Sequence, residues 1–173
     1  MSFLILNLIL SCSAAEPDPV PEPTVEEAPV KRAPPSVEGI DIDALETLLT
    51  SKSDKVRVFN FWATWCGPCV AELPMLREFA REHQEIELVL VSLDMHSVRA
   101  KRVIPYIAKY DLSGLTNYQL EDKDPSVAMR RIEGWPESIP VTLIVDKNGE
   151  TQRQFNAALS KEVLTAALTT LGP

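Results

Sequence analysis

Apolar residues recur along the chain in two patterns, and together these patterns predict alternating strands and helices. Continuous apolar runs predict buried strands, whereas apolar residues three and four positions apart predict helices with one buried face. Strands are expected at 55–62, 86–93, 118–120, 140–145 and 151–155, with a turn at 147–150. Helices are expected at 41–49, 66–83, 97–112, 125–132 and 161–171. This order predicts an α/β fold with a central mixed sheet flanked by helices.

The N-terminal segment carries a different signal. Residues 3–10 form an apolar run that is too short to span a bilayer but has the length of a secretory signal core. The sequence Ile9-Leu10-Ser11-Cys12 resembles a bacterial lipoprotein cleavage site, so Cys12 is the expected lipidated N-terminus. No Lys or Arg precedes the apolar core, and the alternative is an uncleaved N-terminus with an unmodified Cys12.

The next segment reads as a tether. Seven of the 14 prolines lie between residues 16 and 35, among Glu, Val and Ala. Such a composition favours extended backbone, which at about 3.1 Å per residue would hold a domain up to ~70 Å from a lipid surface. We therefore expect a signal at 1–12, a tether at 13–36 and one domain at 37–173.

Composition excludes several classes of protein. Hydrophobic residues make up 45% of the 173 residues and charged residues 24%, which is globular rather than disordered composition. The longest apolar run is too short for a polytopic membrane protein. The formal net charge of −8 argues against binding to nucleic acid.

Two of the three cysteines form a close pair with redox character. Cys66 and Cys69 lie in Trp65-Cys66-Gly67-Pro68-Cys69, directly between a predicted strand and a predicted helix. A thiol at a helix N-terminus is favoured as the thiolate, which is the form that attacks a disulfide. Cys69, one turn further on, is placed to displace the resulting mixed disulfide.

A metal site is the alternative interpretation of these two thiols. A structural zinc ion needs four ligands, but the chain has no second cysteine pair, and His83 and His96 lack ligand spacing. Copper(I) binding stays open, because thiolates suit that ion. We expect no metal and no cofactor.

The residues 61–69, Phe-Trp-Ala-Thr-Trp-Cys-Gly-Pro-Cys, resemble the active-site segment of the thioredoxin superfamily. Together with 70–74 and 139–149, they are most similar to membrane-anchored bacterial thiol-disulfide oxidoreductases of the TlpA/ResA type. The resemblance covers 40–171. It implies a thioredoxin fold with a TlpA-like insert at 94–132.

The resemblance also implies roles for single residues. Pro140 matches the cis-proline of the family, and Ile139 would offer backbone groups to an extended substrate. Glu72 is the expected proton acceptor, because Asn60 stands where cytosolic thioredoxins carry a buried Asp. The alternative for Glu72 is an exposed acid that stabilises the helix dipole.

Residues next to the cysteine pair are expected to bind the substrate. Trp65, Gly67 and Pro68 would form this docking area together with Ile139 and Pro140. Trp62 is an expected core residue. Trp135 would either line the same groove or pack as an ordinary core or loop residue.

The implied function is an extracytoplasmic, lipid-anchored oxidoreductase that reduces protein disulfides through Cys66 and Cys69. Its expected partners are a membrane electron donor and disulfide-bonded clients, with apocytochrome c or copper-site proteins as candidates. The protein is expected to be a monomer. The alternatives are a disulfide oxidant or isomerase, and a copper-delivery module that uses the same thiols.

Overall fold

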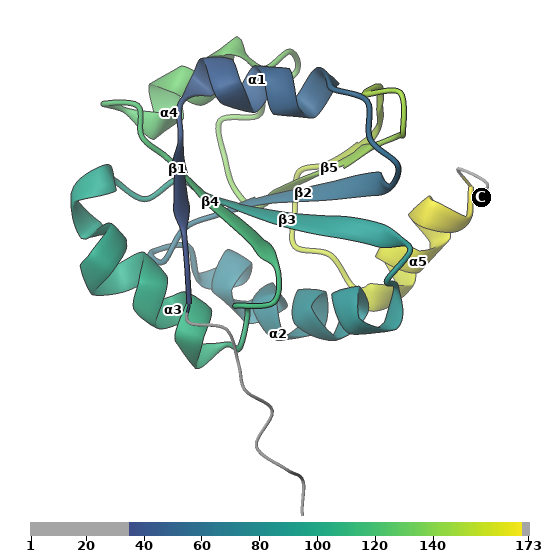
Figure 1. The fold of residues 1–173 in the computed structure, drawn as a ribbon, viewed down its shortest axis with the longest axis horizontal. Helices are drawn as coiled ribbons and strands as arrows, with labels where there is room; N and C mark the ends of the chain where they lie inside the picture. The colour runs from purple at the N-terminus through teal and green to yellow at the C-terminus, as the bar shows by residue number, and fades with distance from the viewer. Residues whose placement is uncertain (1–34, 171–173) are drawn as a thin grey trace, which may run out of the picture. The chain divides into compact units, whose positions relative to one another are not determined.

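The computed structural model describes residues 35–170, in which six strands form one mixed sheet (Figure 1). The strands are β1 (Glu38–Ile40), β2 (Val56–Trp62), β3 (Ile86–Ser92), β4 (Thr116–Leu120), β5 (Val141–Val145) and β6 (Thr151–Phe155). Their order across the sheet is β1-β4-β3-β2-β5-β6. The first four of these are parallel, while β5 runs antiparallel to both β2 and β6.

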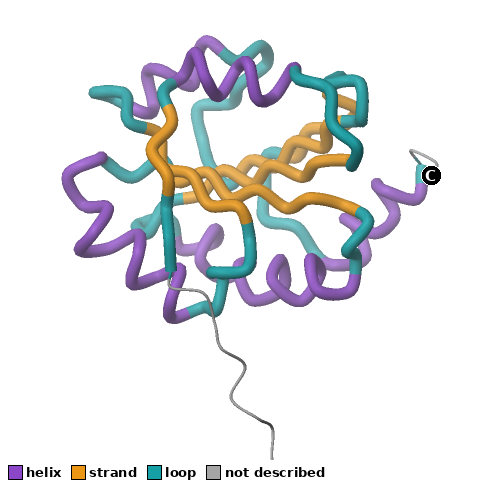
Figure 2. The backbone as a smooth tube through the Cα atoms, viewed as in Figure 1, coloured by secondary structure: helices purple, strands orange, loops and turns teal. Residues whose placement is uncertain are grey.

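Helices cover both faces of the sheet, as Figures 1 and 2 show. They are α1 (Ile42–Thr50), α2 (Gly67–Glu82), α3 (Ile104–Lys109), α4 (Pro125–Ala128) and α5 (Lys161–Thr169). The helices α1 and α4 lie on one face, and α2, α3 and α5 lie on the other. The predicted α/β fold with a central mixed sheet flanked by helices is confirmed.

Alternate residues of β2 supply the two halves of the core. Val58 and Trp62 pack with residues of α2, α3 and α5, whereas Phe59 and Phe61 pack on the α1 side. Side chains of a strand point alternately to opposite faces, so one strand serves both layers. Trp62 is fully buried, as the sequence predicts. The end of β2 is therefore firmly held where it leads to the cysteine pair.

The hydrophobic pattern of the sequence does not predict the first strand. β1 has three residues, and only Ile40 among them is buried. It pairs in parallel with β4, placing Ile40 opposite Leu120. A single buried residue gives no period of two, so only the pairing with a distant strand identifies this segment as β structure.

The prediction of one helix over 97–112 is wrong. The chain instead forms a 3₁₀ turn at His96–Val98, a π-helical turn at Arg99–Val103 and then α3. Pro105 lies in the first turn of α3, where its missing N–H is tolerated. This proline has no N–H to donate to the preceding turn, and a π-helical turn lies directly before α3. The predicted helix at 125–132 likewise splits into α4 and a 3₁₀ turn at Met129–Arg131.

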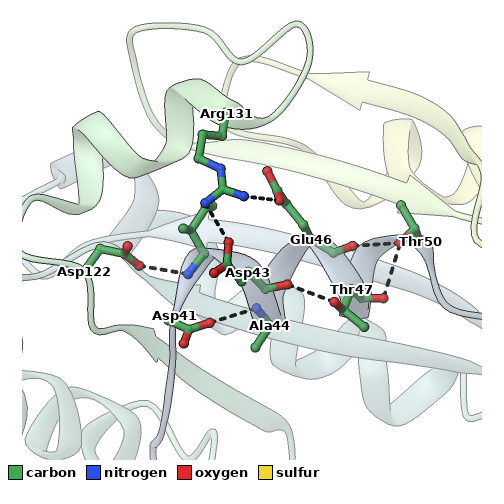
Figure 3. A network of polar contacts seen from close by, with 9 residues as sticks. Asp41, Asp43, Ala44, Glu46, Thr47, Thr50, Asp122 and Arg131 are labelled. Atoms are coloured by element: carbon green, nitrogen blue, oxygen red, sulfur yellow. Dashed lines mark hydrogen bonds and ion pairs between the residues drawn. The ribbon is translucent and has the colours of Figure 1, made fainter.

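The start of α1 is held by side chains from two parts of the chain (Figure 3). Asp41 accepts a hydrogen bond from the Ala44 N–H at 2.8 Å and is the N-cap of the helix. Asp122 accepts from the Ile42 N–H at 2.9 Å. Arg131 forms ion pairs with Asp43 and Glu46 in α1. These contacts join α1 to the segments that follow β4.

Within residues 35–170, no helix has the length and apolarity needed to cross a membrane. The expected signal, Cys12 and nearly all of the expected tether lie outside the described residues. The domain boundaries at 12 and 36 therefore stay predictions.

Candidate active site

A disulfide joins Cys66 and Cys69 at the start of α2. Cys66 is the N-cap residue of this helix, and the backbone N–H of Cys69 donates to Cys66 Sγ at 3.3 Å. The unpaired N–H groups of a helix N-terminus favour an anion. When the pair is reduced, this position favours Cys66 as the thiolate.

The two cysteine residues differ in exposure to solvent. Cys66 retains 6% exposure and Cys69 none. Cys66 is thus the more accessible of the two residues, although it too is largely enclosed. Its neighbours Trp65, Gly67 and Pro68 are exposed, and Trp65 has 62% of its surface free.

The segment before β5 lies beside Cys66. The Ile139–Pro140 peptide bond is cis, which confirms the prediction. The Ile139 carbonyl oxygen lies 3.7 Å from Cys66 Sγ, so the two predicted parts of the site meet in space. This proximity follows from the sheet, because β5 pairs with β2 and Val141 is opposite Phe61.

A groove of about 290 Å³ opens next to the disulfide. Trp65 and Ile139 line it together with Trp135, Leu93 and Ser138. Trp135 also packs edge-on against Phe61, with ring centroids 5.0 Å apart. Both expectations for Trp135 are thus met by one geometry, since one ring lines the groove and packs against the core.

Glu72 is buried beneath the pair, with 4% of its surface exposed. This burial excludes the alternative of an exposed acid. Its Oε1 accepts from Asn60 Nδ2 at 2.8 Å, and its Oε2 accepts from the Leu159 N–H at 2.9 Å. Burial raises the pKa of Glu72 above its ordinary value, and the hydrogen bonds from Leu159 and Asn60 partly oppose that rise. A carboxyl group with a raised pKa, one helical turn from Cys69, has the chemistry of a proton acceptor.

Asp94 is a site residue that the sequence reasoning missed. It is 1% exposed and follows β3. Its carboxylate accepts from the Thr64 N–H at 2.8 Å, from Thr64 Oγ1 at 2.6 Å and from Ser92 Oγ at 2.9 Å. Asp94 therefore holds the loop that leads into Cys66. In the sequence, Asp94 could have been recognised as an acidic residue directly after the apolar run 86–93.

Within the described part of the chain, no group of three or more His, Cys, Asp or Glu side chains could hold a metal ion. The chemistry that these residues offer is that of the thiol pair and the buried carboxylates around it.

Comparison with known sequences identifies a family. The model of the AhpC/TSA family matches residues 30–171. The thiol-disulfide oxidoreductase ResA of Oceanobacillus iheyensis is 30% identical over 135 residues, which cover 77% of this chain and 66% of that protein. ResA of Geobacillus thermodenitrificans is 26% identical, with 77% of this chain and 72% of that protein covered. The chain thus spans just under two thirds of the first relative's length.

Solved structures agree with this assignment. The structure of MTB dsbF, in its mixed oxidized and reduced forms, is 27% identical, with a TM-score of 0.54 over 68% of this chain and 81% of that one. A thio-disulfide isomerase from Thermus thermophilus is 28% identical, with a TM-score of 0.53 over 69% and 81%. The resemblance to TlpA/ResA-type proteins is confirmed. The chain therefore belongs to the AhpC/TSA family of the thioredoxin superfamily, and its domain is similar to thiol-disulfide oxidoreductases.

Proposed function

We propose that the protein reduces disulfide bonds in other proteins, with Cys66 as the attacking thiol and Cys69 as the resolving thiol. The observation that carries this proposal is the placement of the pair. Cys66 caps α2, keeps the greater access to solvent and lies 3.7 Å from the Ile139 carbonyl at the rim of the groove. Cys69 is fully enclosed behind it.

The reaction proceeds by two thiol exchanges. The Cys66 thiolate attacks one sulfur of the client disulfide, forming a mixed disulfide and releasing the first client thiolate. Cys69 then transfers its proton to Glu72 and attacks Cys66 Sγ. The bond between Cys66 and the client breaks, the second client thiolate leaves, and the Cys66–Cys69 disulfide forms. The client gains two electrons, and the protons on Glu72 and in solvent reprotonate its thiolates.

The client binds as an extended segment in the groove. The backbone carbonyl and N–H of Ile139 offer hydrogen bonds to the backbone of the client. Pro140 cannot donate one. Trp65, Gly67 and Pro68 are exposed beside Cys66 and supply the surrounding contact area. The disulfides of apocytochrome c or of copper-site proteins are candidate clients.

The protein acts outside the cytoplasm, anchored by lipid at Cys12 and held away from the membrane by the tether at 13–36. The signal-like run before Cys12 and the proline-rich composition support this location. An oxidising compartment keeps thiols oxidised, so a reductant there needs a membrane electron donor to restore Cys66 and Cys69. The protein works as a monomer.

Two other functions use the same thiols. The structurally similar Thermus thermophilus protein is named an isomerase, so a disulfide isomerase or oxidant is the first alternative. Copper delivery is the second, because two thiolates suit Cu(I). The direction of electron transfer depends on the reduction potential of the pair.

The test combines that potential with an activity assay. We expect the reduced protein to reduce insulin disulfides, with a potential near that of thioredoxin, about −270 mV. A potential near −120 mV, typical of a strong oxidant, would favour the oxidant instead. Failure to reduce insulin together with stoichiometric Cu(I) binding would favour copper delivery.

A further inference from the structure

Asn60 holds one amide group at the centre of the buried site. Asn60 is fully buried in β2, opposite Thr142 in the register of β5. Its Nδ2 donates to Glu72 Oε1 at 2.8 Å and to Thr142 Oγ1 at 3.0 Å. Its Oδ1 is enclosed and has no hydrogen-bond partner among the described residues. The ionised state of Glu72 thus uses the donor half of this amide and leaves the acceptor half idle.

The two charge states of Glu72 need opposite partners. A carboxylate only accepts hydrogen bonds, and Asn60 Nδ2 and the Leu159 N–H supply two donors. A protonated carboxyl has an O–H that needs an acceptor, and an unpartnered O–H in a dry site is unfavourable. A half-turn of the Asn60 amide would present Oδ1 to that O–H. Thr142 can follow the change, because a hydroxyl either donates or accepts.

We propose that Asn60 is a positioning residue that serves Glu72 in both charge states, through Nδ2 when Glu72 is ionised and through Oδ1 when it is protonated. This inference rests on the proposed proton transfer from Cys69 to Glu72. In that step the Cys69 S–H bond breaks, the proton binds Glu72, and the sulfur electron pair forms the bond to Cys66. The Asn60 amide then rotates, so that its Oδ1 accepts from the O–H of protonated Glu72 and the carboxyl group stays in position.

Charged residues on the packed elements have other partners. Arg57 of β2 donates to backbone carbonyls at the end of α1. Lys161 of α5 pairs with Glu82 at the end of α2, and β5 carries no charged residue. Besides Cys69 on its own helix, Glu72 is thus faced by the neutral Asn60 amide and the Leu159 N–H. Burial raises the pKa of Glu72, which favours its protonated state relative to that of an exposed Glu.

The first experiment follows both groups by NMR in the oxidised protein. The probes are the Glu72 carboxyl carbon and the Asn60 side-chain amide, recorded as the pH is varied. We expect the Asn60 amide signals to change at the pH where Glu72 titrates. Glu72→Gln carries a donor and no charge, so it should show the low-pH Asn60 signals at every pH. Asn60 signals that stay constant through the Glu72 titration would overturn the proposal.

The second experiment removes the amide. Asn60→Leu keeps the branched shape but loses the donor to the carboxylate, so the ratio of ionised to protonated Glu72 should fall about tenfold at a given pH. The matched control is Asn117→Leu. Asn117 is also buried, with an unpartnered Oδ1, but its Nδ2 donates to the backbone carbonyls of Leu112 and Leu115. The control should leave the titration of Glu72 unchanged, and an equal effect of both variants would contradict the assignment.

These measurements separate the inference from the proposed function. They use the oxidised protein, so they need no turnover, and the first leaves Asn60 itself intact. In turnover, Asn60→Leu should shift the pH profile of the resolving step and have no added effect in the Glu72→Gln background. An amide that follows Glu72 in a protein unable to reduce insulin would refute the function alone. A protein that reduces insulin while its Asn60 amide ignores Glu72 would refute the inference alone.

Discussion

The backbone N–H of Leu159 donates to Glu72 Oε2 at 2.9 Å, joining residues that lie 87 positions apart. Leu159 belongs to the segment before α5, and Glu72 follows the first turn of α2. The carboxyl group that lies nearest in sequence to the resolving cysteine thus also anchors the C-terminal helix. Because burial raises the pKa of Glu72, its proton affinity and the stability of the fold are coupled.

This coupling predicts how stability depends on pH. The folded-state pKa of Glu72 lies above its ordinary value of 4.5, so the folded chain holds this proton more tightly than the unfolded chain. The stabilisation is complete below pH 4.5 and is lost as the pH rises through the folded-state pKa, by up to ~1.4 kcal/mol per pH unit within that window. Urea unfolding of the oxidised protein at a series of pH values measures this slope. Glu72→Gln should remove the contribution of Glu72 to this slope.

The control for this measurement is Glu133→Gln, which changes an exposed carboxylate outside the site. It should keep the slope of the wild type. An identical slope in the wild type and in Glu72→Gln would show that Glu72 has the same pKa in the folded and unfolded chains.

The unequal burial of the two cysteines predicts different fates for their serine variants. Cys69→Ser keeps the attacking thiol but cannot release the client, so it should accumulate as mixed disulfides. Cys66→Ser should form none, because the remaining thiol is fully enclosed. Both should lose insulin reduction. Electrophoresis without reductant of each variant, purified from its native compartment, reveals the adducts, and adducts on Cys66→Ser would show that the two roles are exchanged.

Local patterns in the sequence predicted most of the framework. The apolar run at 55–62 is a short-range signal, and it corresponds to β2. No such signal predicts β1, because this strand depends on pairing with β4. The turns before α3 have no such signal either, because they depend on the proline in the first turn of that helix. Composition alone does not record these long-range constraints.

The features of the site also divide into those that the sequence predicts and those that it does not. The spacing of Cys66 and Cys69 is visible in the sequence, and resemblance placed Pro140 beside them. The hydrogen bonds of Asp94 to Thr64 were not visible, because they join positions 30 residues apart through the sheet. The donor from Leu159 was equally hidden. Polar partners of buried groups become apparent only when the chain is folded.

Lipidation predicts a specific mass at the N-terminus. If Cys12 is the processed first residue, protein from the native membrane should begin at Cys12 and carry acyl chains, since each buried methylene adds about 0.8 kcal/mol of membrane binding. Mass spectrometry of the N-terminal peptide measures this, and Cys12→Ser should release the protein from the membrane fraction. An unmodified N-terminus at Met1 would refute the anchor.

The hydrogen bonds of Asp94 predict that its replacement lowers both the stability of the fold and the rate of insulin reduction. Asp94→Ala removes the acceptor for Thr64 and Ser92 and leaves buried donors unpaired, which should cost about 2–4 kcal/mol in the free energy of unfolding. Ser92→Ala, which removes one of these hydrogen bonds, should cost less. Urea unfolding and the rate of insulin reduction measure the two effects. Full activity of folded Asp94→Ala would show that the loop before Cys66 needs no such support.

The exposed position of Trp65 predicts that its removal causes a defect that depends on the size of the substrate. Its ring is 62% exposed at the groove, so Trp65→Ala should leave stability nearly unchanged. A docked protein client would cover this ring, and losing the contact should raise KM for insulin about tenfold, which corresponds to ~1.4 kcal/mol. A small disulfide such as hydroxyethyl disulfide does not reach across the groove, so its kcat/KM should stay unchanged. Val163→Ala, at an exposed apolar residue of α5, is the matched control and should affect neither substrate. Equal losses with both substrates in Trp65→Ala would instead place the role of Trp65 at the reactivity of Cys66.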